Sequence, residues 1–164
     1  NGKTVEIHNT DAEGRLILAD ALSRATAEGP DAIVDLATLT GACMVALGET
    51  HAGVMGTSQP WVDQVIAAAE VAGEKAWPLP LPDDWRSKLD SDIADMKNIG
   101  GRYGGASVAG LFLKEFVGDG IPWAHLDIAG PAFVDTETPT DRKGGTGYGV
   151  RTLLALLKAY KRPR

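Results

Sequence analysis

The sequence has 164 residues, of which 44% are hydrophobic and 23% charged, and its formal net charge is −6. This length and composition are ordinary for a globular domain with its own hydrophobic core. The acidic balance argues against nucleic-acid partners, because phosphate contacts need clustered Lys and Arg. No apolar run is long enough to cross a bilayer, so no membrane partner is expected. One cysteine, Cys43, cannot form an intrachain disulfide, which suits a reducing cytoplasm.

Hydrophobic patterning predicts alternating strands and helices, and therefore an α/β fold in which residues 1–164 form one domain. In chain order, strands are predicted at 4–8, 32–39, 51–58 and 122–130, and helices from about 14 to 28, then at 61–74, 107–118 and 149–161. The strand at 32–39 is nearly all apolar, so we expect it to be buried on both faces. Segment 76–84 holds three prolines and is expected to be an edge strand or an extended loop.

Two carboxylates and a guanidinium gather at the first strand-to-helix junction. Asp11 and Glu13 are separated by one residue, and Arg15 follows within the segment NTDAEGRL. A hard divalent cation prefers anionic oxygen ligands on a fixed backbone, and an anionic intermediate is stabilised by a nearby positive charge. The pattern therefore predicts part of a catalytic metal site.

The same residues have a purely structural interpretation. Thr10-x-x-Glu13 before an apolar run matches a capping box, in which the hydroxyl and the carboxylate each satisfy a free backbone N–H. Two neighbours argue against helix stability as their only role. Gly14 lies in the first turn, where glycine costs about 1 kcal/mol relative to Ala. Arg15 places a positive charge at the positive end of the helix dipole.

Three other features of the sequence give weaker evidence for a functional site. The glycine-rich runs GGRYGG (100–105) and GGTGYG (144–149) lack the context of a P-loop or a dinucleotide-binding turn, so we interpret both as loops. The three histidines lie singly in strand-like segments, which favours hydrogen-bonded core or edge positions over metal ligation. Cys43 lies in the apolar run GACMVAL and is expected to be a buried, inert thiol.

Five segments in order resemble the leucine aminopeptidase (cytosol aminopeptidase) family. They are NTDAEGRLILADAL from Asn9, DLATLTGA from Asp35, SDIADMKNIG from Ser91, HLDIAG from His125 and GGTGYGVRTL from Gly144. The resemblance covers essentially the whole chain. It implies a C-terminal portion of a catalytic domain with a mixed β-sheet sandwiched between helices, as in zinc-peptidase-like folds.

The resemblance also implies roles for individual residues. Asp11 matches a ligand that holds one metal through its carboxylate and its main-chain carbonyl, and Glu13 matches the carboxylate that bridges two metals. Arg15 matches the catalytic arginine, which holds a bicarbonate in this family. Thr38, Leu39 and Gly41 match the segment that lines the substrate cleft. The family's remaining ligands, a Lys and two Asp, and its catalytic Lys precede the signature and are not in this chain.

The family's activity is metal-dependent release of N-terminal amino acids from peptides, with two divalent ions (Mn or Zn, with Mg or Co as alternatives) activating a water. The resemblance further implies peptide substrates with a free N-terminus and a homohexamer. We expect these 164 residues to be inactive alone. Two alternatives stay open: a non-catalytic family member that acts in assembly or DNA binding, and an unrelated hydrolase that uses Asp11 and Glu13 without metal.

Overall fold

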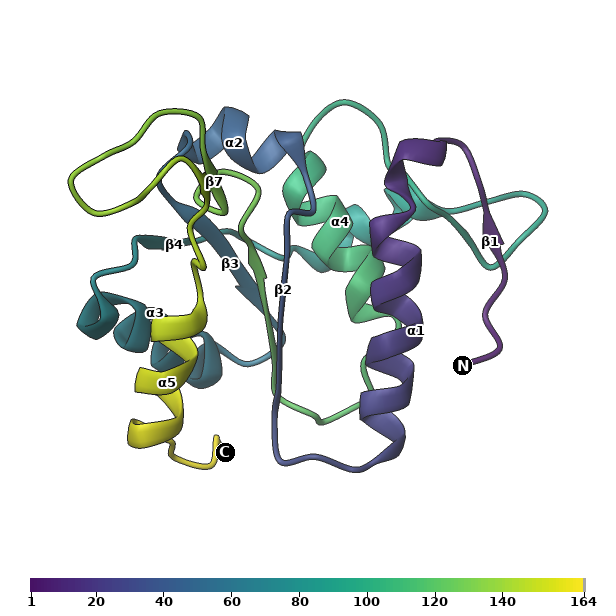
Figure 1. The fold of residues 1–164 in the computed structure, drawn as a ribbon. Helices are drawn as coiled ribbons and strands as arrows, with labels where there is room; N and C mark the ends of the chain where they lie inside the picture. Colours follow the sequence, from purple (N-terminus) through teal and green to yellow (C-terminus); the bar gives the residue numbers. More distant parts are fainter. Residues whose placement is uncertain (164) are drawn as a thin grey trace.

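A four-stranded mixed sheet with helices on both faces organises the fold in the computed structural model, which describes residues 1–163 (Figure 1). The strand order is β2 (Ile33–Ala37), β6 (Trp123–Asp127), β3 (Ala52–Gly56) and β4 (Ala76–Pro78). β6 runs parallel to β2 and antiparallel to β3, and β3 runs parallel to β4. The expected mixed sheet between helices is therefore confirmed.

Two helices cover each face of the sheet. α1 (Gly14–Ala27) and α4 (Gly105–Lys114) pack on one face around Trp123 and Phe112. α3 (Gln59–Ala72) and α5 (Val150–Ala159) pack on the other face around Val54 and Leu126. The alternation of side chains along β6 serves both cores, and all five of its residues are buried, as a central strand requires.

Shorter elements complete the chain. β1 (Val5–Glu6) pairs in parallel with β5 (Met96–Lys97), and β7 (Phe133–Val134) pairs with β8 (Gly144–Gly145). Helix α2 (Gly41–Leu47) follows β2 after a short loop. Two 3₁₀ helices span Thr10–Ala12 and Asp83–Leu89. No helix within residues 1–163 combines the length and the apolar character that a membrane crossing needs.

Most of the predicted elements occur where the sequence patterns place them. At the end of α1, the Glu28 N–H donates to the Ala25 carbonyl and the N–H of Gly29, which has φ 63°, donates to the Thr26 carbonyl. The proline-rich segment begins with β4, an edge strand, as expected. Cys43 is fully buried within α2. His125 is buried too, and its Nδ1 lies 2.6 Å from Asp35 Oδ1, which confirms a hydrogen-bonded core histidine.

One expectation was wrong. β2 was predicted to be buried on both faces, but it forms an edge of the sheet, and four of its five residues are only half-buried. Its apolar composition suits a central strand, yet no further strand among residues 1–163 pairs with it. The outer edge of β2, between α1 and α5 in Figure 1, therefore has backbone N–H and C=O groups that no strand among residues 1–163 pairs.

Candidate functional site

The signature segment forms a tight turn between β1 and α1. Asn9 has extended backbone angles (φ −144°, ψ 121°), and its side chain accepts a hydrogen bond of 2.9 Å from the Asp11 N–H. That bond starts the 3₁₀ turn Thr10–Ala12, and α1 follows at Gly14. The two carboxylates therefore leave a short, hydrogen-bonded turn instead of a mobile loop.

The capping-box alternative does not occur. Thr10 lies inside the 3₁₀ turn, whereas Glu13 precedes α1 with helical backbone angles and makes no side-chain capping bond. The capping residue of this turn is Asn9. Among residues 1–163, no hydrogen bond or ion pair engages the carboxylate of Asp11 or Glu13. Both residues are exposed, so their oxygens are available to a ligand.

These two carboxylates could serve as part of the ligand set of a hard divalent cation. Carboxylate oxygens are the ligands that Mg and Mn favour and that Zn accepts. No group of three or more His, Cys, Asp and Glu side chains among residues 1–163 could hold a metal ion. A complete site would therefore need ligands beyond Asp11 and Glu13.

Arg15 lies in the first turn of α1 and is buried, with 8% of its surface exposed. One guanidinium nitrogen, Nη1, donates a 2.6 Å hydrogen bond to the Asn98 carbonyl, while Nε has no partner among residues 1–163. The guanidinium also lies 5.9 Å from the centre of the Phe112 ring. Burial lowers the pKa of Arg15, and the nearby Asp127 carboxylate opposes this effect. An arginine stays protonated at neutral pH even so, which fixes a positive charge here.

The second predicted segment follows the end of β2. Thr38 and Gly41 are exposed and Leu39 is half-buried against the α1–α4 core. The buried carboxylate of Asp127 holds this loop: its Oδ1 accepts bonds from the Leu39 and Thr40 N–H groups at 3.1 and 3.3 Å. Its Oδ2 accepts a 2.6 Å bond from the Thr40 hydroxyl, and that hydroxyl caps α2 by accepting from the Cys43 N–H.

The fold brings the two segments to one end of the sheet. β2 and β6 are parallel, so the loop after β2 and Asp127 at the end of β6 lie together. The start of α1 lies at the same end, at the top of Figure 1. Arg15 belongs to the first segment, and the Asp127 carboxylate of the second lies close enough to oppose the lowering of the Arg15 pKa by burial.

Two residues in this region were not singled out from the sequence. Asp127 organises the loop at 38–40, and Asn98 contacts both the signature turn and Arg15. Each lies in one of the five segments that carry the family resemblance. A carboxylate at the end of an apolar strand was a usable signal for Asp127. Asn98 carries no such signal, because its partners lie about 90 positions earlier in the sequence.

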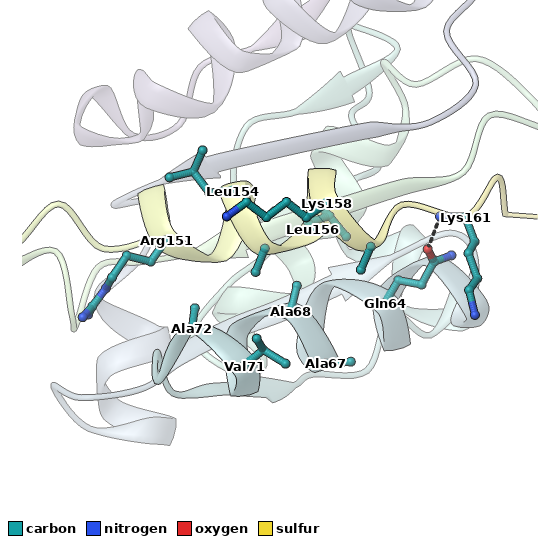
Figure 2. Close-up of a pocket in the computed structure, with 12 residues that line it drawn as sticks. Gln64, Ala67, Ala68, Val71, Ala72, Arg151, Leu154, Leu156, Lys158 and Lys161 are labelled. Carbon is teal, nitrogen blue, oxygen red and sulfur yellow. Dashed lines mark hydrogen bonds between the residues drawn. The ribbon is translucent and has the colours of Figure 1, made fainter.

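A separate cavity of about 650 Å³ lies between α3 and α5, on the opposite face of the sheet (Figure 2). Small and apolar side chains line it, among them Ala67, Ala68, Val71 and Leu154. None of the predicted site residues is among the residues that line it. The candidate site is therefore the sheet end near Asp11 and Glu13, not this cavity.

The mixed sheet with helices on both faces places the chain in the α/β class, with a carboxylate-bearing turn near one end of the sheet. The sequence profile of the catalytic domain of the cytosol aminopeptidase family matches residues 1–154. The chain therefore belongs to the cytosol aminopeptidase family.

Individual relatives agree with this assignment. A probable cytosol aminopeptidase of Streptomyces avermitilis is 59% identical over 160 residues, which cover 95% of this chain and 31% of the relative. That of Aquifex aeolicus is 55% identical over 155 residues and is covered to 31%. The chain thus spans about a third of the length of these curated relatives.

Solved structures share the fold. A tomato leucine aminopeptidase mutant superposes with a TM-score of 0.91 at 48% identity, covering 96% of this chain and 30% of that one. The bottromycin maturation enzyme BotP, in complex with Mn, superposes with a TM-score of 0.90 at 47% identity, covering 96% of this chain and 36% of that one.

Proposed function

We propose that the complete protein containing this chain releases N-terminal amino acids from peptides with the help of two divalent metal ions. The observation that carries this proposal is the pair of exposed, unbonded carboxylates beside a buried guanidinium, in a chain of the cytosol aminopeptidase family. Mn is the favoured metal, because one structural relative was solved with it, and Zn, Mg and Co are alternatives. The protein would act in the cytoplasm as a homohexamer.

Asp11 and Glu13 would hold the metals, Glu13 between the two ions and Asp11 on one of them. When bound, such ions supply Lewis acidity and activate a water for attack on the peptide carbonyl. The turn that fixes both carboxylates limits the rearrangement needed to bind a cation, because Asn9 already bonds the Asp11 N–H. The remaining ligands would come from the part of the protein outside this chain.

Arg15 would supply fixed positive charge and position an anion such as bicarbonate near the reacting carbonyl. The guanidinium makes one hydrogen bond to residues 1–163, which leaves other donors free for such an anion. The loop at Thr38, Leu39 and Gly41 would hold the substrate backbone, since Thr38 and Gly41 are exposed at the same sheet end. Binding two ends of the substrate in fixed orientation removes much of the entropic cost of reaction.

The substrate's free amine is the group that distinguishes this function from other hydrolases. The complete protein, loaded with Mn, should hydrolyse leucyl p-nitroanilide and lose this activity when a chelator removes the metal. It should not hydrolyse N-acetyl-leucyl p-nitroanilide, because acetylation removes the amine's charge and its ability to bind a metal. Equal turnover of both substrates, or chelator-resistant turnover, would reject the proposal.

A further inference from the structure

Asn98 uses all of its polar groups on the segment that carries the candidate site. The residue is completely buried and follows β5, which pairs with β1. Its side-chain oxygen accepts bonds from the His8 and Asn9 N–H groups at 2.9 and 3.3 Å, and its side-chain nitrogen donates to the Asn9 carbonyl at 2.7 Å. Its backbone N–H donates to the Glu6 carbonyl at 3.0 Å.

Hydrogen bonds of Asn98 reach both the turn that carries Asp11 and Glu13 and the Arg15 guanidinium. The Asn98 carboxamide holds Asn9 by two hydrogen bonds, and the Asn9 side chain in turn accepts a bond from the N–H of Asp11, which starts the turn toward Glu13. The Asn98 carbonyl accepts the 2.6 Å bond from Arg15, which is the one hydrogen bond of that guanidinium among residues 1–163. One residue thus connects the turn that carries the carboxylates with the Arg15 guanidinium.

We propose that Asn98 is a positioning residue, which sets the Asp11–Glu13 turn in register with the Arg15 guanidinium. The inference rests on the proposed function, and Asn98 itself touches neither metal nor substrate. A carboxamide suits the task because it accepts two bonds and donates one in the same plane, with no charge to desolvate. Buried partners that orient metal ligands typically contribute about 10- to 100-fold to metal affinity or activity.

The test uses the complete protein with Asn98→Ala and Asn98→Asp. The aspartate keeps both accepted bonds and the side-chain shape but cannot donate to the Asn9 carbonyl when ionised, so it decides the question if the alanine variant does not fold. The matched control is Thr152→Val, which removes a buried 2.5 Å hydrogen bond to Glu74 on the opposite face of the sheet. Within residues 1–163, the Thr152 N–H and hydroxyl both donate to Glu74 and not to the signature turn.

Three quantities are measured below the melting temperature of each variant: Mn(II) affinity of the apoprotein by electron paramagnetic resonance, amide hydrogen exchange in residues 9–15, and kcat at saturating Mn. We expect Asn98→Ala to weaken Mn binding about 10- to 100-fold, to speed exchange in residues 9–15 and to lower kcat. Asn98→Asp should change all three in the same direction, and Thr152→Val should change none.

Two failures can be told apart. If the wild-type protein hydrolyses leucyl anilide in a metal-dependent way but the Asn98 variants bind Mn and turn over like Thr152→Val, the positioning role is overturned. If the wild-type protein neither binds Mn nor hydrolyses the anilide, the proposed function is overturned, and the inference about Asn98 with it.

Discussion

Cys43 is kept as a neutral thiol by its surroundings. It is fully buried, and its Sγ lies 3.7 Å from the Asp127 carbonyl oxygen. Burial and, to a smaller degree, the negative charge of Asp127 raise the pKa of Cys43 from 9.0 to about 11. The thiol is therefore a packing group at neutral pH, in agreement with the interpretation of the sequence.

This raised pKa predicts a pH dependence of stability. The contribution of the neutral thiol is fully present below pH 9 and is lost as the pH rises through about 11, since the unfolded chain ionises first. Burial also raises the pKa of Tyr148 and adds to the loss. Between pH 8 and about 11, the melting temperature should fall more steeply with pH for the wild type than for Cys43→Ala. The same pH dependence of melting temperature in both proteins would contradict the raised pKa of Cys43.

Arg15 is expected to contribute to catalysis more than to stability. Replacing it by Met keeps an unbranched apolar stem against Phe112 but removes the charge. The lost bond to the Asn98 carbonyl is offset by removal of a buried Nε that has no partner. We predict that Arg15→Met lowers kcat by about 10²- to 10³-fold, as loss of one stabilising donor does.

The accompanying measurement is thermal melting of the complete protein. A small change in melting temperature together with the loss of kcat supports the catalytic role. A large drop in melting temperature with unchanged kcat would make Arg15 a structural residue.

At the scale of elements, the start of α5 depends on a carboxylate that follows α3 in the chain. Glu74, just after α3, is buried and accepts bonds from the N–H groups of Gly149 and Thr152 at 3.1 and 2.9 Å. Gly149 has φ 94°, and a Cβ there would lie 2.3 Å from Leu36 Cδ2, so this start is also sterically fixed. Glu74 thus supplies both the cap and the negative charge that the N-terminus of a helix favours.

Removal of this cap should destabilise the protein. Glu74→Ala leaves buried N–H donors without partners, at a cost of about 1–3 kcal/mol per buried group. We predict a loss of free energy of unfolding of about 2–3 kcal/mol in chemical denaturation. The control is Glu70→Ala, an exposed glutamate of α3, which should change stability by less than about 0.5 kcal/mol. Equal effects of the two variants would remove Glu74 from this role.

The elements differ in how far the sequence predicts them. Periodicity placed α1, α3, α4 and β6, because their apolar patterns reflect burial that the chain itself completes. Asn98 and Glu74 could not be found in this way, since each satisfies backbone groups of a segment about 75–90 residues away. The Thr10–Glu13 pattern misled for a related reason: Asn9 caps the turn, and Asn98 fixes Asn9. A local sequence motif does not reveal that a residue far along the chain will hold a different capping residue in place.

At the scale of the whole molecule, the edge of β2 indicates a further strand. In the parallel register, the backbone N–H and C=O groups of Ile33, Asp35 and Ala37 point toward β6. Those of Val34 and Leu36 therefore point away from β6, toward the open edge. Unpaired edges of apolar strands are aggregation sites that folded proteins avoid. The matched relatives are about three times longer than this chain, which leaves ample length for a strand to pair here.

Amide hydrogen exchange on the complete protein tests this expectation. The Val34 and Leu36 amides should be protected to the same extent as those of Asp35 and Ala37, because all four would lie in a paired ladder. Exchange of Val34 and Leu36 as fast as that of exposed loops would show that β2 is an edge in the complete protein as well.

Glu13 is proposed to hold metal for peptide hydrolysis, and bound Mn measured together with leucyl anilide turnover tests this role most directly. The complete protein is compared as wild type, Glu13→Gln and Asp20→Asn, the last an exposed α1 carboxylate without a hydrogen bond or ion pair among residues 1–163. We predict that Glu13→Gln loses metal and at least about 100-fold in kcat, the equivalent of several kcal/mol of metal activation. Its melting temperature without metal should match that of the wild type, because the Glu13 carboxylate makes no bond in the fold, and Asp20→Asn should behave as wild type. Near-normal turnover by Glu13→Gln with metal bound would contradict the account.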